Sequence, residues 1–251
     1  MTADATLYSV ERGIATITLN RPDNRNALSN ELMNSLGDNV GLAMSDDAVR
    51  LVVLTNESNT FCAGADLKGG SAEPSRHSLV DTLIAMQDGS KPVVGKIAGH
   101  CTGGGNGLAA ACDISIAADD VFFAFTEVRI GVAPAIISVV CLPKLRRADA
   151  AELFLTGKRC HAPRAAEIGL INRAVPRGDL DAAVDELCSD LLAGGPNALA
   201  SAKQLVYRVP TMDRTEAYGW TAKLSAELFA AEEGAAGIAA FRQKSKPGWA
   251  P

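Results

Sequence analysis

The chain has 251 residues, of which 47% are hydrophobic and 21% charged, a composition that excludes an intrinsically disordered protein. Its formal net charge of −5 provides no basic field for a nucleic-acid backbone, so we expect no nucleic-acid partner. The longest apolar run, residues 132–143, has about 12 residues and contains two prolines, whereas a membrane-spanning helix needs about 20, so we expect no membrane insertion.

Cysteine and histidine are dispersed along the chain. Six cysteines occur singly in apolar segments, without a Cys-x-x-Cys pair, which predicts reduced, buried thiols and a cytoplasmic protein. The three histidines lack the spacing of metal ligands, so we predict no metal site.

Short β-branched segments alternate with helical ones in the first half of the chain. Residues 14–20 alternate Ile and Thr and predict a strand that ends in a turn at 21–24. Ser29 is a helix cap, because apolar residues follow it every four positions at Leu32, Leu36 and Val40. The pattern continues with strands at 50–55, 92–98, 113–118 and 122–125, and with helices at 78–86 and 105–112. This alternation predicts an α/β fold with parallel strand pairs.

Helical segments dominate from about residue 133 onward. We predict helices at 148–155 and 179–192 and one longer helix at 212–233. The tail, residues 243–251, shows little periodicity and is predicted to be loosely ordered.

Two small-residue turns follow predicted strands. Gly103, Gly104 and Gly105 stand at the start of a predicted helix, where unpaired amides and the helix dipole favour negative charge. Neither a phosphate-loop nor a dinucleotide-binding pattern occurs there, and a simple packing contact is the alternative. The turn at residues 61–68 is similarly small, so the two turns together predict an oxyanion hole for a carbonyl that gains charge.

A carboxylate completes the candidate site. Glu127 follows an apolar strand, where burial would raise its pKa and suit it to proton transfer. A structural ion pair with Arg129 is the alternative. Asp113 is predicted to have a structural role. No Gly-x-Ser-x-Gly nucleophile motif is present.

Residues 26–28, the turn at 61–68, residues 103–113, and Glu127 followed by Gly131 together resemble the enoyl-CoA hydratase/isomerase (crotonase) superfamily. The resemblance implies a crotonase-like spiral of ββα repeats over residues 1–190 and a helical C-terminal trimerisation segment over residues 191–251. It also implies an acyl-CoA or enoyl-CoA thioester substrate, so that coenzyme A is part of the substrate and no separate cofactor is needed, and a homotrimer or a hexamer of two trimers.

The resemblance assigns roles residue by residue. The amides of Ala65 and Gly104 would bind the thioester oxygen, and Glu127 would transfer the proton. The coenzyme A groove would be lined by Arg25, Leu28, Ala63, Asp66 and Leu67, with the adenine near the last three.

One position departs from the typical pattern of the family. Typical hydratases carry two glutamates, and Gly107 stands where the first is found. The segments at 104–108 and 127–138 resemble members that hydrate methylglutaconyl-type thioesters and also lack that glutamate. We therefore predict a hydratase that works with Glu127 alone. A 3,2-enoyl-CoA isomerase and a non-catalytic acyl-CoA-binding protein are the alternatives.

Overall fold

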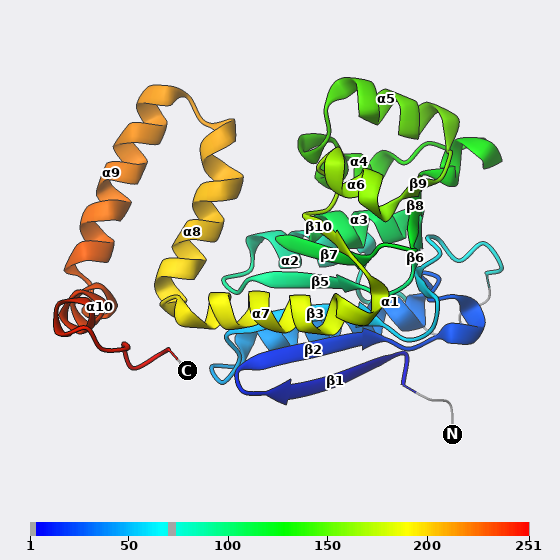
Figure 1. Ribbon diagram of the computed structural model, residues 1–251. Coiled ribbons are helices and arrows are strands. Elements are labelled where there is room, and N and C mark those ends of the chain that lie inside the picture. The colour runs from blue at the N-terminus through cyan, green and yellow to red at the C-terminus, as the bar shows by residue number, and fades with distance from the viewer. Residues whose placement is uncertain (1–3, 70–73, 251) are drawn as a thin grey trace.

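The computed structural model describes residues 4–69 and 74–250, which form two β-sheets with helices around them (Figure 1). The larger sheet has the order β1-β2-β3-β5-β7-β10 and the smaller one β4-β6-β8-β9. All pairs are parallel except β1 with β2 and β8 with β9. The larger sheet consists of β1 (Thr6–Glu11), β2 (Ile14–Leu19), β3 (Leu51–Asn56), β5 (Val93–Ile97), β7 (Ile114–Ala118) and β10 (Arg173–Val175), and the smaller one of β4 (Thr60–Cys62), β6 (His100–Thr102), β8 (Phe122–Ala124) and β9 (Cys160–His161).

Successive strands alternate between the two sheets. Strands β3, β5 and β7 lie in the larger sheet, and each is followed by a short strand, β4, β6 or β8, of the smaller sheet. A helix comes next: α2 (Leu79–Asp88) after β4, α3 (Gly104–Ala111) after β6, and the 3-10 helix η2 (Thr126–Ile130) with α4 (Ala135–Cys141) after β8. The predicted spiral of ββα repeats is therefore confirmed.

The first helix begins where the sequence predicts. Helix α1 (Asn30–Ser45) is capped by Ser29, whose hydroxyl accepts a hydrogen bond from the N–H of Leu32. The apolar positions of α1 face the core beside β2, and all six residues of the neighbouring strand β3 are buried. The remaining helices of the body are α5 (Arg147–Thr156), α6 (Ala162–Glu167) and α7 (Leu180–Ala193). Helix α5 ends at left-handed Gly157, as predicted.

The last helices form an arm that projects from the body (Figure 1). It consists of α8 (Pro196–Arg208), α9 (Arg214–Ala230) and α10 (Glu232–Gln243). The prediction of one helix over 212–233 is wrong, because Ala231 is extended and ends α9 before α10 begins. The carboxylate of Glu233 instead accepts hydrogen bonds from the N–H groups of Asn197 and Ala198 at the start of α8. This capping interaction requires the chain to turn at that point.

The C-terminal tail is docked, contrary to the expectation of loose order. The indole N–H of Trp249 donates to the carbonyl of Ala193 at 3.2 Å. Arg50 donates from the body to the carbonyls of Trp249 and Gly194, at 3.2 and 2.6 Å. Sequence periodicity misses these contacts because they join residues that are far apart in the chain.

Asp113 holds the arm to the body. One carboxylate oxygen accepts from the N–H of Val93 at 2.7 Å and lies 2.9 Å from the Nζ of Lys203, while the other accepts from the hydroxyl of Tyr207 at 2.9 Å. Lys203 is 7% exposed and also donates to two carbonyls of the body, those of Met86 and Lys91. The predicted structural role of Asp113 is confirmed.

Candidate functional site

The site is built at the ends of three neighbouring strands. Strands β4, β6 and β8 are adjacent and parallel, so the turns that follow them meet at one edge of the smaller sheet. These turns carry Ala65, Gly104 and Glu127, and all three line one cavity of about 330 Å³. The structure thus brings together the three residues that the sequence suggested for catalysis.

Glycine lets the first two turns touch. Gly64 and Gly103 have φ angles of +85° and +54°, which side chains with a Cβ rarely adopt. A methyl group at Gly64 would lie 3.1 Å from the amide nitrogen of Gly104. Within the described residues, the N–H groups of Ala65 and Gly104 donate no hydrogen bond, so both remain available to a ligand oxygen.

The carboxylate of Glu127 lies over the glycine turn. Its Oε1 would be 3.5 Å from a methyl group at Gly103, and its Oε2 is buried without a hydrogen-bond partner among the described residues. Burial raises the pKa of Glu127, partly offset by a hydrogen bond from its own backbone. The ion pair with Arg129 does not form, because that guanidinium donates to the carbonyl of Thr156 at 3.3 Å.

The raised pKa of Glu127 predicts a cost in stability at neutral pH. The folded state favours the protonated carboxyl, so the cost is absent below the ordinary pKa of 4.5 and is complete once the pH has risen through the raised value. We expect Glu127→Gln to raise the melting temperature by a few degrees at pH 8, and the difference from wild type to vanish below pH 4.5. Thermal unfolding at both pH values checks this. A Gln variant that is less stable than wild type at pH 8 would contradict it.

Two buried asparagines, which sequence reasoning missed, hold the site together. Asn26 accepts from the N–H of Arg21 at 2.7 Å and donates to the carbonyl of Thr60 at 2.8 Å, which fixes the turn before α1 against β4. Asn106 donates to the carbonyl of Ala124 at 2.8 Å, and the same carbonyl accepts from the N–H of Gly103. Asn106 therefore ties α3 to the end of β8, just before η2, which carries Glu127.

The residues predicted to line the coenzyme A groove separate into two groups. Leu28, Ala63 and Leu67 line the cavity, and the N–H of Leu28 donates to the carbonyl of Gly64 at 2.8 Å. Asp66 and Arg25 do not line it. The carboxylate of Asp66 accepts from the side chain of Asn24 and the N–H of Lys68, at 3.2 and 3.0 Å.

Arg25 contributes its backbone to the same region. Its φ angle is +50°, its carbonyl accepts from the N–H of Ala63 at 3.0 Å, and its side chain is exposed. A contact of Arg25 with a phosphate of coenzyme A stays a prediction, as do the assigned roles of the other groove residues.

Ile137 occupies the space beside Gly107. A methyl group at Gly107 would collide with Cγ2 of Ile137 and lie 3.0 Å from its Cβ. Ile137 is 3% exposed, belongs to α4 and lines the cavity. The position at which typical hydratases carry a glutamate is thus packed against a branched alkyl group.

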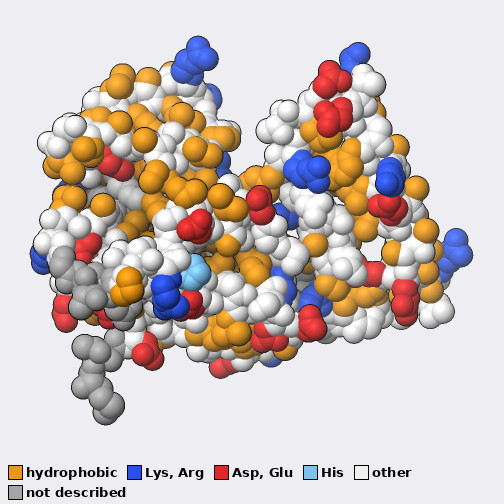
Figure 2. Space-filling model, turned by 180° about the vertical axis from the view of Figure 1, so that it is seen from behind, with side chains coloured by type: hydrophobic (Ala, Val, Ile, Leu, Met, Phe, Trp, Pro, Cys, Tyr) orange, Lys and Arg blue, Asp and Glu red, His pale blue; other side chains and the backbone are white. Residues whose placement is uncertain are grey.

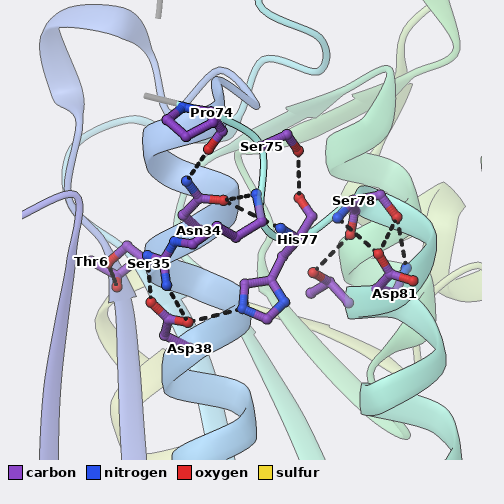
Figure 3. Close-up of polar contacts among 11 residues, drawn as sticks. Thr6, Asn34, Ser35, Asp38, Pro74, Ser75, His77, Ser78 and Asp81 are labelled. Carbon is purple, nitrogen blue, oxygen red and sulfur yellow. Dashed lines mark hydrogen bonds and ion pairs between the residues drawn. The ribbon is translucent and has the colours of Figure 1, made fainter. Parts of the chain in front are cut away.

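A group of polar side chains on α1 fastens the segment that leads into α2 (Figure 3). Asn34 donates to the carbonyl of Pro74 at 2.9 Å and accepts from the N–H groups of Arg76 and His77, at 2.7 and 3.3 Å. Asp38 lies 2.9 Å from Nε2 of His77 and 2.7 Å from the guanidinium of Arg76. These bonds to Asn34 and Asp38 hold residues 74–77 just before α2.

This fastening sets one wall of the cavity. Ser78 caps α2 in a reciprocal arrangement with Asp81, and the next residue, Leu79, lines the cavity. A methyl group at Gly104 would lie 3.5 Å from the Cδ2 of Leu79. The start of α2 is therefore positioned next to the candidate oxyanion hole.

Removal of the Asn34 amide should destabilise this region. Asn34→Ala leaves three backbone groups without their partner, so we expect about 2 kcal/mol less free energy of unfolding, measured by urea denaturation. Asn39→Ala is the matched control on the same helix, because the Asn39 amide donates a single hydrogen bond within the described residues, to the hydroxyl of Thr6. Equal losses in the two variants would show that Asn34 has no special role.

Comparison with known proteins identifies the family. The family model described as enoyl-CoA hydratase/isomerase matches residues 9–251. The chain belongs to this family. A crystal structure of an enoyl-CoA hydratase from Mycobacterium smegmatis is 34% identical, with a TM-score of 0.90 and 98% of each chain covered.

Two further known proteins are similar to this chain over nearly their whole length. An enoyl-CoA hydratase from Mycobacterium avium is 40% identical, with a TM-score of 0.73, and the match covers 99% of this chain and 100% of that one. The 2,3-dehydroadipyl-CoA hydratase of Escherichia coli is 29% identical, and the match covers 96% of each chain.

The structure also bears on metals and membranes. Across residues 4–69 and 74–250, no group of three or more His, Cys, Asp or Glu side chains is arranged to hold a metal ion. No helix in that same part of the chain combines the length and the apolar character needed to cross a bilayer.

Proposed function

We propose that this enoyl-CoA hydratase/isomerase family member hydrates a 2-enoyl-CoA thioester with Glu127 as its single acid and base. The observation that carries the proposal is the convergence on one cavity of two unengaged amides, those of Ala65 and Gly104, and the carboxylate of Glu127, whose Oε2 is buried without a partner among the described residues. Donors aimed at one oxygen beside a proton carrier suit a reaction that passes through an enolate.

The proposed reaction needs one carboxylate. Glu127 takes a proton from water as the water oxygen bonds to C3, and the C2=C3 electron pair moves onto the thioester oxygen. The N–H groups of Ala65 and Gly104 stabilise the resulting enolate. Glu127 then returns the proton to C2, so the product is the 3-hydroxyacyl thioester and the enzyme is regenerated. The raised pKa of Glu127 supports this double role.

Isomerisation of a 3-enoyl to a 2-enoyl thioester is the second candidate. Here Glu127 would move a proton from C2 to C4 through the same enolate, and no water would have to be held. The packing of Ile137 against Gly107 favours this candidate, because it removes the space for a second polar group. A purely binding role is less favoured, since it has no use for a carboxylate oxygen that is buried without a partner.

A paired assay tests the proposal. The purified protein is offered a 2-enoyl-CoA and a 3-enoyl-CoA of the same chain length, and the absorbance of the conjugated thioester is followed. A decrease with the 2-enoyl substrate supports the hydratase, and an increase with the 3-enoyl substrate supports the isomerase. Conversion of neither substrate, with acyl-CoA still bound, would contradict both and support the binding role.

We also propose that the protein assembles as a homotrimer, or as a hexamer of two trimers, through the projecting arm. Large apolar side chains are exposed there, at Val206, Tyr218, Phe229 and Phe241. Figure 2 shows, from behind, a notch that separates the arm from the body. Light scattering measures the assembly, and a monomer at micromolar concentration would contradict it.

The six buried, unpaired thiols support a cytoplasmic location.

A further inference from the structure

The walls of the cavity around Glu127 are almost entirely apolar. Apart from Glu127 and Thr126, the lining consists of glycine, alanine, proline and larger aliphatic residues. No Lys, Arg or His side chain lines it within the described part of the chain. Its larger aliphatic side chains are those of Leu28, Leu67, Leu79, Ile130, Val132, Ile136 and Ile137.

Lys68 follows the lining residue Leu67 and is exposed, but it does not line the cavity. Arg129 donates to the carbonyl of Thr156, and Lys144 donates to the carbonyl of Cys112 at 3.2 Å. Residues 70–73, which lie outside the described part, are Gly, Ser, Ala and Glu and include no cation. Within the described part of the chain, none of these cations lines the cavity in which we place the acyl group.

We propose that this pocket selects thioesters with an uncharged, apolar acyl chain and discriminates against acyl chains that carry a second carboxylate. The inference rests on the proposed function, because it takes the cavity as the acyl site. A second carboxylate would lose its water without gaining a cation and would share the cavity with Glu127. The resemblance to members acting on methylglutaconyl-type thioesters, whose acyl group has such a carboxylate, would then not extend to substrate choice.

Binding of saturated thioesters tests the inference without requiring turnover. We would measure the Kd of hexanoyl-CoA, adipoyl-CoA and free coenzyme A by calorimetry on the full chain. We expect adipoyl-CoA to bind about 100-fold more weakly than hexanoyl-CoA, the loss expected for a buried charge that lacks a partner. Equal affinity for the two thioesters would overturn the inference, as would hexanoyl-CoA that binds no more tightly than coenzyme A. Selective binding without conversion of any enoyl-CoA would contradict the proposed function alone.

A variant pair on α4 locates the selectivity. Ile136 lines the cavity and is 49% exposed, whereas Val139, on the same helix and 72% exposed, does not line it. We expect both positions to accept a long side chain at little cost to folding, because about half or more of each side chain is exposed. We expect Ile136→Arg to reduce the preference for hexanoyl-CoA at least tenfold, and Val139→Arg to leave it unchanged. An unchanged preference in Ile136→Arg would overturn the assignment of this wall.

Discussion

Replacement of Glu127 by glutamine is expected to lower turnover by about 10²- to 10⁴-fold, the contribution of a positioned acid or base. Glutamine keeps the shape of the side chain but carries no proton for transfer. The fold should remain intact, since Glu127 has one buried oxygen without a partner and no ion pair to lose. Steady-state kinetics with an enoyl-CoA and calorimetry with hexanoyl-CoA separate turnover from binding.

The matched control for Glu127→Gln is Glu186→Gln. Glu186 is exposed on α7, outside the cavity, so its loss of charge should leave kcat and KM at wild-type values. A Glu127→Gln enzyme that retains turnover within threefold of wild type would show that another group transfers the proton.

Removal of the Gly104 amide is the second change from which we expect a large loss of turnover. Gly104→Pro deletes one of the two proposed donors to the thioester oxygen and should lower kcat by about 10²- to 10³-fold. Proline is tolerated at the first position of a helix, which is where Gly104 stands in α3. Binding of coenzyme A should change far less than kcat, because the donor is proposed to act on charge that develops in the transition state.

Gly104→Ala distinguishes the lost amide from crowding. Both variants place a carbon 2.5 Å from the Cδ1 of Leu28, at the flexible end of that side chain, but alanine keeps the N–H. We expect Gly104→Ala to retain most of the activity that Gly104→Pro loses. Equal losses in the two would indicate that Gly104 is needed for packing and not as a donor.

Much of the core architecture could be predicted from local pattern. The Ile and Thr alternation of β2, the capped periodicity of α1 and the Gly157 stop of α5 each depend on neighbouring residues, and the structure confirms them. The small-residue turns after β4 and β6 could also be predicted, because a turn that needs a positive φ angle favours glycine, which is visible in the sequence. The division at residue 190 stays a prediction.

The parts that sequence reasoning missed depend on distant contacts. Asn26 and Asn106 anchor the site through carbonyls of β4 and β8, and an isolated asparagine gives no signal of such a partner. The break at Ala231 follows from Glu233 capping a different helix. Ile137 could not be placed beside Gly107 from spacing, since α3 and α4 meet only in the folded chain.

Proton exchange at C2 of a saturated thioester reports directly on proton transfer by Glu127. We would incubate hexanoyl-CoA with the enzyme in D₂O and measure deuterium at C2 by mass spectrometry, for wild type and Glu127→Gln. We expect exchange by wild type and its loss in the variant, because Glu127 is proposed to remove and return the proton through an enolate held by the amides of Ala65 and Gly104. Absence of exchange in a wild-type protein that binds hexanoyl-CoA, or undiminished exchange in Glu127→Gln, would contradict it.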